Sequence, residues 1–206
     1  MDAALSLARA LDAPALDATL RRAAATMGVW SFIERVAAPL LRRVGDEWHA
    51  GRLTPPQEHL VSTMLHDILG GTMRALPQQI GAPKVLVATP AGDRHAIGAA
   101  LVGAASALEG WNVLYLGADL PAADIADAAR AAGVRVVAIS IVYTADRAHV
   151  LGELRSLCLR LPADVALIAG GAGATSLARE LVAMDVRVES SIPGLVAELR
   201  RHRPAE

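Results

Sequence analysis

The hydrophobic pattern changes its period between residues 77 and 83, and this change constrains the fold more than any other feature of the sequence. Before it, apolar residues such as Ile33, Val36, Leu40 and Val44 recur at every third or fourth position, which is typical of amphipathic helices. After it, short β-branched runs that are apolar on both faces alternate with helical segments. The chain therefore divides into an all-helical part and a part with a parallel sheet covered by helices.

The domain prediction follows from this division. We expect a four-helix bundle over residues 1–77, a linker over residues 78–82 and an α/β domain over residues 83–206. The predicted strands are Lys84 to Thr89, Asn112 to Leu116, Val134 to Val142, Val165 to Ala169 and Val186 to Glu189. Five parallel strands joined by helical crossovers predict a flavodoxin-like (Rossmann-like) sheet with the strand order 2-1-3-4-5.

Charge and cysteine content exclude several classes of protein. The 20 Lys and Arg residues balance 21 Asp and Glu residues, so the basic surface of a nucleic-acid binder is not expected. The single Cys158 cannot form an internal disulfide, and the N-terminus lacks a secretion signal. The longest apolar stretch, Ala96 to Leu108, is shorter than the roughly 20 residues that span a bilayer. We expect a cytoplasmic protein without direct contact with nucleic acid or membrane.

The loop after the first predicted strand carries a candidate metal ligand. Ligands of open parallel sheets bind beyond the carboxyl ends of the strands, and this loop contains the motif D-x-H-x-x-G, from Asp93 through His95 to Gly98. A carboxylate can hold one imidazole nitrogen of a nearby histidine so that the other is presented to a metal. Alternatively, Asp93 caps the following helix and His95 is an ordinary residue of its first turn. The spacing alone leaves both interpretations open.

Two further strand ends should lie beside this loop. The third strand ends in S-x-V, from Ser140 to Val142, and the fourth is followed by the pair Gly170–Gly171. Together with D-x-H-x-x-G, these motifs resemble the cobalamin-binding module shared by methionine synthase, the methylmalonyl-CoA mutases and related proteins. That family usually has S-x-L, so S-x-V is a mild departure from its pattern.

The resemblance implies a cofactor and a role for each of these residues. In that module the histidine displaces the dimethylbenzimidazole base of the cofactor and ligates cobalt from below. By resemblance, His95 is the lower axial cobalt ligand, and Asp93 and Ser140 support it. The other residues implied to bind the cofactor are Arg94, Ile97, Gly98, Val142, Gly170 and Gly171.

A second candidate group of residues lies in the helical part. Trp48 and His49 should end one helix, while Glu58 and His59 should lie in the first turn of the next, so that all four converge on one patch facing the α/β domain. The alternatives are a core position for Trp48, solvated positions for both histidines, and a favourable helix N-terminal charge for Glu58. The spacing W-x9-E-H, with a histidine directly after the tryptophan, resembles the helical cap of the CarH family of B12-dependent photoreceptors.

This second resemblance extends from about Leu5 to Arg200 and implies a light sensor. In CarH-type proteins the bundle caps the upper face of adenosylcobalamin, and light breaks the bond between cobalt and carbon. Carried over, Trp48 covers the adenosyl group, and His49 is the candidate upper cobalt ligand after photolysis. Glu58 and His59 are then further contacts of the adenosyl group. The cofactor supplies the photochemistry and the protein supplies a two-state switch.

The same resemblance frames the expected partners and the alternatives. CarH-type proteins carry an N-terminal DNA-binding segment that is missing here, so we expect a homo-oligomer or a transcription-regulatory partner protein, and no enzymatic activity. The alternative is a corrinoid methyl-carrier subunit of a methyltransferase system. Those carriers typically continue the loop as D-x-H-D-I-G-K-N, whereas His95 is followed here by Ala96. A simple metal protein would need His49, His59, His66 and His95 without any supporting motif.

Overall fold

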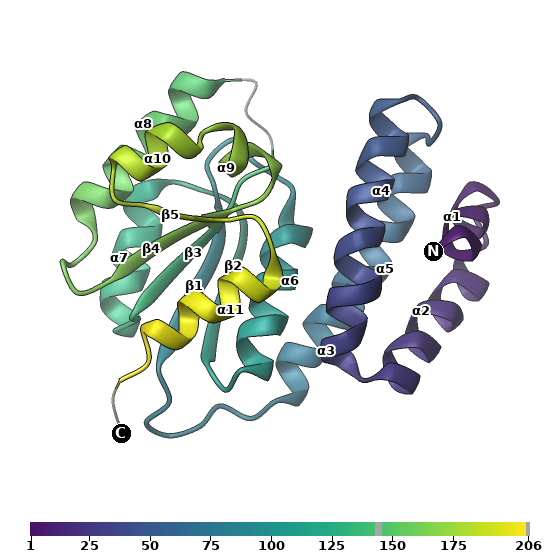
Figure 1. The fold of residues 1–206 in the computed structure, drawn as a ribbon, viewed down its shortest axis with the longest axis horizontal. Coiled ribbons are helices and arrows are strands. Elements are labelled where there is room, and N and C mark those ends of the chain that lie inside the picture. The colour runs from purple at the N-terminus through teal and green to yellow at the C-terminus, as the bar shows by residue number, and fades with distance from the viewer. Residues whose placement is uncertain (143–145, 205–206) are drawn as a thin grey trace. The chain divides into compact units, whose positions relative to one another are not determined.

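The computed structural model describes residues 1–142 and 146–204, and the chain forms two compact units (Figure 1). One unit runs from Met1 to Ala75 and the other from Leu76 to Glu206. Within the described residues, no helix is both long enough and apolar enough to cross a lipid bilayer.

The first unit is a bundle of helices, as predicted. Its elements are α1 (Asp2–Arg9), α2 (Ala13–Met27), α3 (Val29–Phe32), the π-helical η1 (Ile33–Ala37), α4 (Ala38–His49) and α5 (Pro55–Ala75). Asp12 caps α2 by accepting the N–H of Ala15 at 3.1 Å, and Gly28, at a φ of 77°, separates α2 from α3. The buried side chains include Leu5, Leu16, Leu20, Phe32, Leu40 and Leu65.

The third helix of the bundle contains a π-helical stretch that the hydrophobic pattern did not predict. The residues at the junctions of α3, η1 and α4 keep right-handed helical angles, so these three elements form one continuous helix. Within it, Ala38 donates its N–H to the carbonyl of Ile33, five residues earlier. Pro39 follows and has no N–H to continue the regular pattern of hydrogen bonds. Four helices therefore result, with one extra residue inside the third.

The second unit contains a parallel sheet in the predicted order, β2-β1-β3-β4-β5. The strands are β1 (Lys84–Pro90), β2 (Asn112–Leu120), β3 (Val136–Ser140), β4 (Ala166–Gly170) and β5 (Arg187–Glu189). The predicted end of β3 at Val142 was wrong, because the Val142 N–H donates to a side chain instead of a neighbouring strand. The predicted end of β2 at Leu116 was also wrong, since the strand continues to Leu120 through an irregular register that weak strand formers occupy.

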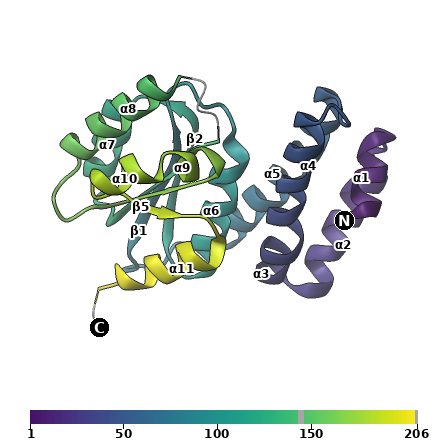
Figure 2. The ribbon, with the colours of Figure 1, turned by 45° about the horizontal axis from the view of Figure 1, so that its top comes forward.

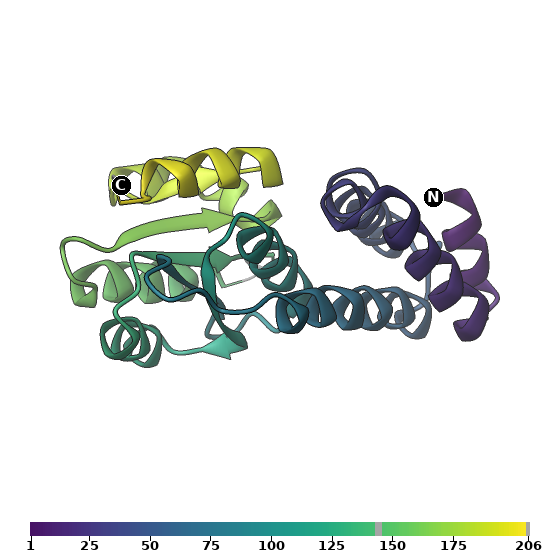
Figure 3. The ribbon, with the colours of Figure 1, turned by 90° about the horizontal axis from the view of Figure 1, so that it is seen from below.

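Helices cover both faces of this sheet. They are α6 (Ala96–Leu108), α7 (Ala122–Ala132), α8 (Arg147–Arg160), α9 (Ala172–Ser176), α10 (Ala178–Ala183) and α11 (Ile192–Arg201). Leu86 and Ala88 of β1 pack in one core with α7, α8 and α10, while Val85 and Val87 pack in a second core with α6 and α11. Figure 2 shows α7 and α8 on the opposite side of the strands from α11, and Figure 3 shows the same unit from below.

Candidate functional site

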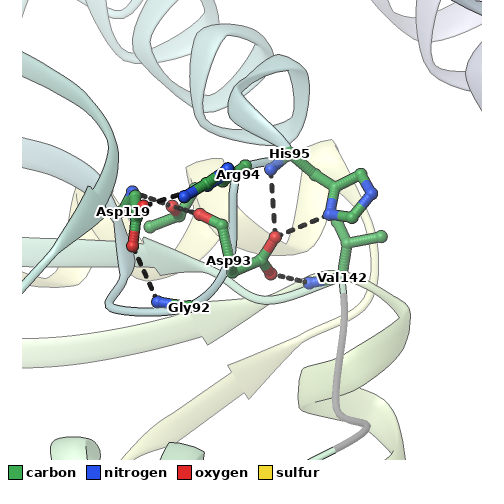
Figure 4. Close-up of polar contacts among 7 residues, drawn as sticks. Gly92, Asp93, Arg94, His95, Asp119 and Val142 are labelled. Atoms are coloured by element: carbon green, nitrogen blue, oxygen red, sulfur yellow. Dashed lines mark hydrogen bonds and ion pairs between the residues drawn. The ribbon is translucent and has the colours of Figure 1, made fainter.

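The loop after β1 holds a histidine through a buried carboxylate. Asp93 is fully buried, and its Oδ1 accepts hydrogen bonds from the backbone N–H of His95 at 3.0 Å and from its Nδ1 at 2.7 Å (Figure 4). Because an ionised carboxylate only accepts, the proton of a neutral His95 ring resides on Nδ1. Nε2 is then the ring nitrogen with a lone pair for a metal.

The same carboxylate connects this loop to the end of β3. Its other oxygen, Oδ2, accepts the N–H of Val142 at 2.6 Å. Asp93 thus spans the ends of β1 and β3, and β1 lies where the strand order reverses, between β2 and β3. The carboxylate serves His95 and Val142, which both lie outside α6, so ordinary capping of that helix does not describe its role. The side chain of His95 is 49% exposed at this edge of the sheet.

Two of the predicted glycines lie where any side chain would collide with a neighbour. A Cβ on Gly98 would run into the Oγ of Ser140, which is itself buried. A Cβ on Gly171, whose φ is +99°, would run into the carbonyl of Ile141. The structure therefore brings D-x-H-x-x-G, S-x-V and G-G together at one edge of the sheet, as their strand positions predicted.

The structure adds residues that no motif singled out. Asp119, near the end of β2, accepts the N–H of Gly92 at 2.8 Å and the Nε–H of Arg94 at 3.2 Å. The N–H of Gly92, followed by the Arg94 guanidinium, lowers the pKa of the Asp119 carboxyl below its usual value. Arg94, predicted to bind a cofactor, is thus partly engaged in holding the loop. An acidic residue at the carboxyl end of a strand beside the loop was the signal that could have revealed Asp119.

Another histidine also lies close to this loop. A Cβ on Gly92 would lie 3.6 Å from the Cδ2 of His149 in α8, so the imidazole packs beside the Gly92 backbone. The backbone N–H of His149 donates to the capping carboxylate of Asp146 at 2.9 Å. His149 fits no motif, and only the pairing of its helix against the sheet reveals its place.

In the bundle, Trp48 and His49 form an exposed pair at the end of α4. Their rings meet edge to face, with centroids 4.8 Å apart and planes at 78°. Trp48 is 43% exposed, so the alternative of a core aromatic is wrong. The Nδ1–H of His49 donates to the carbonyl of Gly45 at 2.7 Å, which leaves Nε2 as the nitrogen directed away from the helix backbone.

Glu58 and His59 form a second polar pair at the start of α5. The Glu58 carboxylate contacts the Nδ1 of His59 at 2.6 Å and accepts the hydroxyl proton of Ser62 at 2.5 Å. Across the part of the chain that the structure describes, no hydrogen bond or ion pair joins this pair to Trp48 or His49. That all four converge on one patch facing the α/β domain stays a prediction.

A simple metal protein, one of the alternatives, needs a cluster of metal-ligating side chains. Among residues 1–142 and 146–204, no group of three or more His, Cys, Asp and Glu side chains is placed to hold a metal ion. The histidine set proposed for that alternative, which comprised His49, His59, His66 and His95, is therefore not assembled as a metal centre in these residues.

Comparison with known proteins agrees with the motifs. Two family models match, each described as a B12 binding domain, one over residues 83–199 and the other over residues 2–70. The HTH-type transcriptional repressor CarA of Myxococcus xanthus is 31% identical over 200 residues, covering 96% of this chain and 66% of that protein. The HTH-type transcriptional repressor CarH of the same organism is 33% identical over 174 residues, covering 84% and 57%. The chain spans about two thirds of the length of CarA and less than that of CarH.

Solved structures confirm the predicted fold. The monomethylamine corrinoid protein of Methanosarcina barkeri aligns with a TM-score of 0.76 at 16% identity, over 96% of this chain and 95% of that one. The methanol:cobalamin methyltransferase complex MtaBC of the same organism aligns with a TM-score of 0.51 at 18% identity, over 96% and 77%. Identities this low establish the fold alone, which is a helical bundle followed by a Rossmann-like sheet.

Proposed function

This chain belongs to the family of B12-binding domains, and from that premise we propose that it is a light-sensing module that binds adenosylcobalamin. His95 is the lower axial ligand of cobalt, in place of the dimethylbenzimidazole base. Trp48 covers the upper face, and His49 is the upper ligand after illumination. The output is control of transcription through a DNA-binding segment outside this sequence or through a partner protein.

The arrangement of Asp93 and His95 carries the proposal. The Oδ1 of the buried carboxylate lies 2.7 Å from the His95 Nδ1 and favours a proton on that nitrogen, so that Nε2 offers its lone pair in a defined direction. A single histidine suits a metal whose equatorial ligands come from a macrocycle. Gly98 and Gly171 pack without side chains against Ser140 and Ile141, which keeps these segments close. We assign the buried Ser140 hydroxyl the role of donor to an inserted base. The residues present therefore fit a corrinoid.

The bundle supports the light-sensing part of the proposal. When bound, adenosylcobalamin supplies a bond between cobalt and carbon that light cleaves. Trp48 presents a large flat ring, 43% exposed, which suits the covering of an adenosyl group. His49 holds its own Nδ1–H on the Gly45 carbonyl, so its Nε2 suits metal ligation. Glu58 and His59 offer hydrogen-bonding groups to the same ligand.

The proposed output follows from the named relatives. CarA and CarH are both HTH-type transcriptional repressors, and they match this chain across its two units. We propose a homo-oligomer or a regulatory partner as the route from this module to DNA, and no catalytic role.

Reconstitution with adenosylcobalamin in darkness tests the function directly. We expect a base-off, histidine-ligated spectrum that changes on illumination, together with a change in molecular size in scattering or gel filtration. His95→Ala should lose the histidine-ligated spectrum, while His202→Ala, a histidine of the C-terminal end, should keep it. An identical spectrum for His95→Ala would overturn the ligand assignment.

The alternative of a corrinoid methyl carrier shares the fold and is separated by the same experiment. A carrier should bind methylcobalamin at least as well as adenosylcobalamin and show no light-dependent change in size or shape. Stable adenosylcobalamin binding without any response to light would overturn the sensor and leave cobalamin binding intact.

A further inference from the structure

We propose that Asp119 is a positioning residue for the histidine loop, and that it sets the direction in which His95 meets cobalt. This inference rests on the proposed function, because it concerns His95 as a metal ligand. No motif assigns a role to Asp119, and its contacts with the loop come from the far side of β1 relative to β3.

Asp119 holds the loop through both its side chain and its backbone. Its Oδ1 accepts the N–H of Gly92 at 2.8 Å and its Oδ2 accepts the Nε–H of Arg94 at 3.2 Å (Figure 4). Its own N–H donates to the carbonyl of Asp93 at 3.1 Å and to the Oγ1 of Thr89 at 2.9 Å. The fully buried Thr89 hydroxyl in turn donates to the Asp93 carbonyl. We call these contacts the Asp119 clasp.

The end of β2 is bent so that Asp119 reaches the loop. Ala88 pairs with Gly117, whereas Pro90 pairs with Leu120, so β2 advances three residues while β1 advances two. Such a bulge re-aims the strand, and bulges are common beside functional sites. Asp119 itself has a φ of 63°, in the left-handed region that non-glycine residues seldom adopt and aspartate tolerates. The clasp contacts hold it in that conformation.

The clasp and the Asp93 carboxylate secure the same residue from opposite sides. The backbone of Asp93 is bound from β2 by Asp119, and its carboxylate is bound by Val142, which follows the end of β3. His95 takes its orientation from that carboxylate. Loss of the Asp119 carboxylate removes the contacts with Gly92 and Arg94, the two neighbours of Asp93, but keeps the backbone bond to the Asp93 carbonyl. It should therefore loosen the β2 side only, and alter the ligation geometry without abolishing cofactor binding.

Two substitutions separate the carboxylate from the backbone conformation. Asp119→Gly removes the carboxylate and suits a φ of 63°, whereas Asp119→Asn keeps an acceptor and tolerates the same φ. Asp127→Ala is the matched control, because Asp127 is an exposed carboxylate of α7 paired with Arg130. Thermal unfolding of the apo protein shows whether each variant folds.

Three measurements read the orientation of His95. Nitrogen-15 NMR of the apo protein reports the ring tautomer, binding titration gives the Kd of hydroxocobalamin, and EPR of bound cob(II)alamin reports hyperfine splitting from the axial nitrogen. For Asp119→Gly we expect a larger fraction of the Nε2–H tautomer, a Kd raised about 10-fold, and weakened nitrogen splitting. Asp119→Asn should lie between wild type and Asp119→Gly, and Asp127→Ala should match wild type.

The outcomes distinguish this inference from the proposed function. An Asp119→Gly variant that melts lower but keeps the wild-type tautomer, Kd and nitrogen splitting would overturn the positioning role. A wild-type protein that binds no cobalamin would overturn the proposed function, while the apo tautomer would still decide the role of the clasp. If Asp119→Gly does not fold, Asp119→Asn with wild-type values in all three measurements would overturn the inference.

Discussion

The two candidate groups of residues are held in opposite ways. In the α/β unit, His95 is bound to the fully buried carboxylate of Asp93, which also accepts the N–H of Val142 just after β3. The backbone carbonyl of Asp93 is bound in turn by Asp119 of β2. In the bundle, Trp48 and His49 lie exposed at a helix end, and the His49 ring donates to the carbonyl of Gly45 in its own helix. The first arrangement is preorganised by tertiary contacts, and the second by local ones.

This difference separates binding from response. A ligand that must be held in one geometry benefits from a rotamer fixed by buried partners. A group that must exchange one contact for another benefits from having few packing contacts and hydrogen bonds with the core. We therefore expect substitutions in the histidine loop to change cofactor affinity and substitutions near Trp48 to change which upper ligand is preferred.

The largest effect is expected for Asp93→Ala. The substitution removes the acceptor of the His95 Nδ1–H and leaves the Val142 N–H without its carboxylate. The affinity for hydroxocobalamin should fall about 100-fold, and the free energy of unfolding should fall by about 1–3 kcal/mol. Titration and chemical denaturation measure the two. Unchanged affinity relative to an Asp127→Ala control would contradict a preorganised ligand.

Gly98→Ala should have the next largest effect. Its Cβ would collide with the buried Oγ of Ser140, and such overpacking costs about 1–3 kcal/mol of unfolding free energy. Removal of the hydroxyl in the double variant Gly98→Ala/Ser140→Ala should restore part of that loss. Gly152→Ala is the control, since a Cβ there would meet nothing within 4 Å beyond the adjacent backbone of its own helix. Denaturation of wild type, Gly98→Ala, Ser140→Ala and the double variant completes the cycle, and strict additivity would contradict the collision.

A smaller and more selective effect is expected for Trp48→Ala. Because Trp48 is exposed, the free energy of unfolding should change by less than about 0.5 kcal/mol. The affinity for adenosylcobalamin should fall about 5- to 10-fold in darkness, whereas the affinity for hydroxocobalamin should not change. Met27→Ala, at another exposed apolar position of the bundle, is the control. An equal loss of affinity for adenosylcobalamin and hydroxocobalamin would contradict the proposed division between the two regions.

The smallest effect concerns Glu47, the residue before Trp48. Hydrogen bonding from Arg52, with the charges of Arg52 and Arg9, lowers the pKa of Glu47 from 4.5. A lowered carboxyl pKa contributes stability that is present above pH 4.5 and lost as the pH falls through the lower folded value. The Tm of the wild-type protein should fall more in that acidic window than the Tm of Glu47→Gln. Parallel pH profiles would show that the ion pairs do not hold this helix end.

Sequence patterns predicted the parts of the fold that depend on hydrophobic periodicity. The change of period near residue 77 predicted the helical part and the sheet, and β-branched runs predicted strand order because parallel crossovers allow few alternatives. Gly98 and Gly171 were found because strand ends meet at one edge. Periodicity does not predict contacts that depend on the exact register of neighbouring strands. Asp119 reaches the loop only through a bulge, and Val142 leaves the strand for a side chain that no local pattern identifies.

The π-helical stretch from Ile33 to Ala37 has a consequence for the face on which Trp48 emerges. Each residue of an α-helix turns the chain by about 100° around its axis. The extra residue in this stretch therefore resets the angular phase of α4 relative to α3, while Phe32 before it and Leu40 after it both remain buried. A chain shorter by one residue here would rotate Trp48 by about 100° relative to Phe32. The direction of the tryptophan is thus set by a count of residues more than ten positions away.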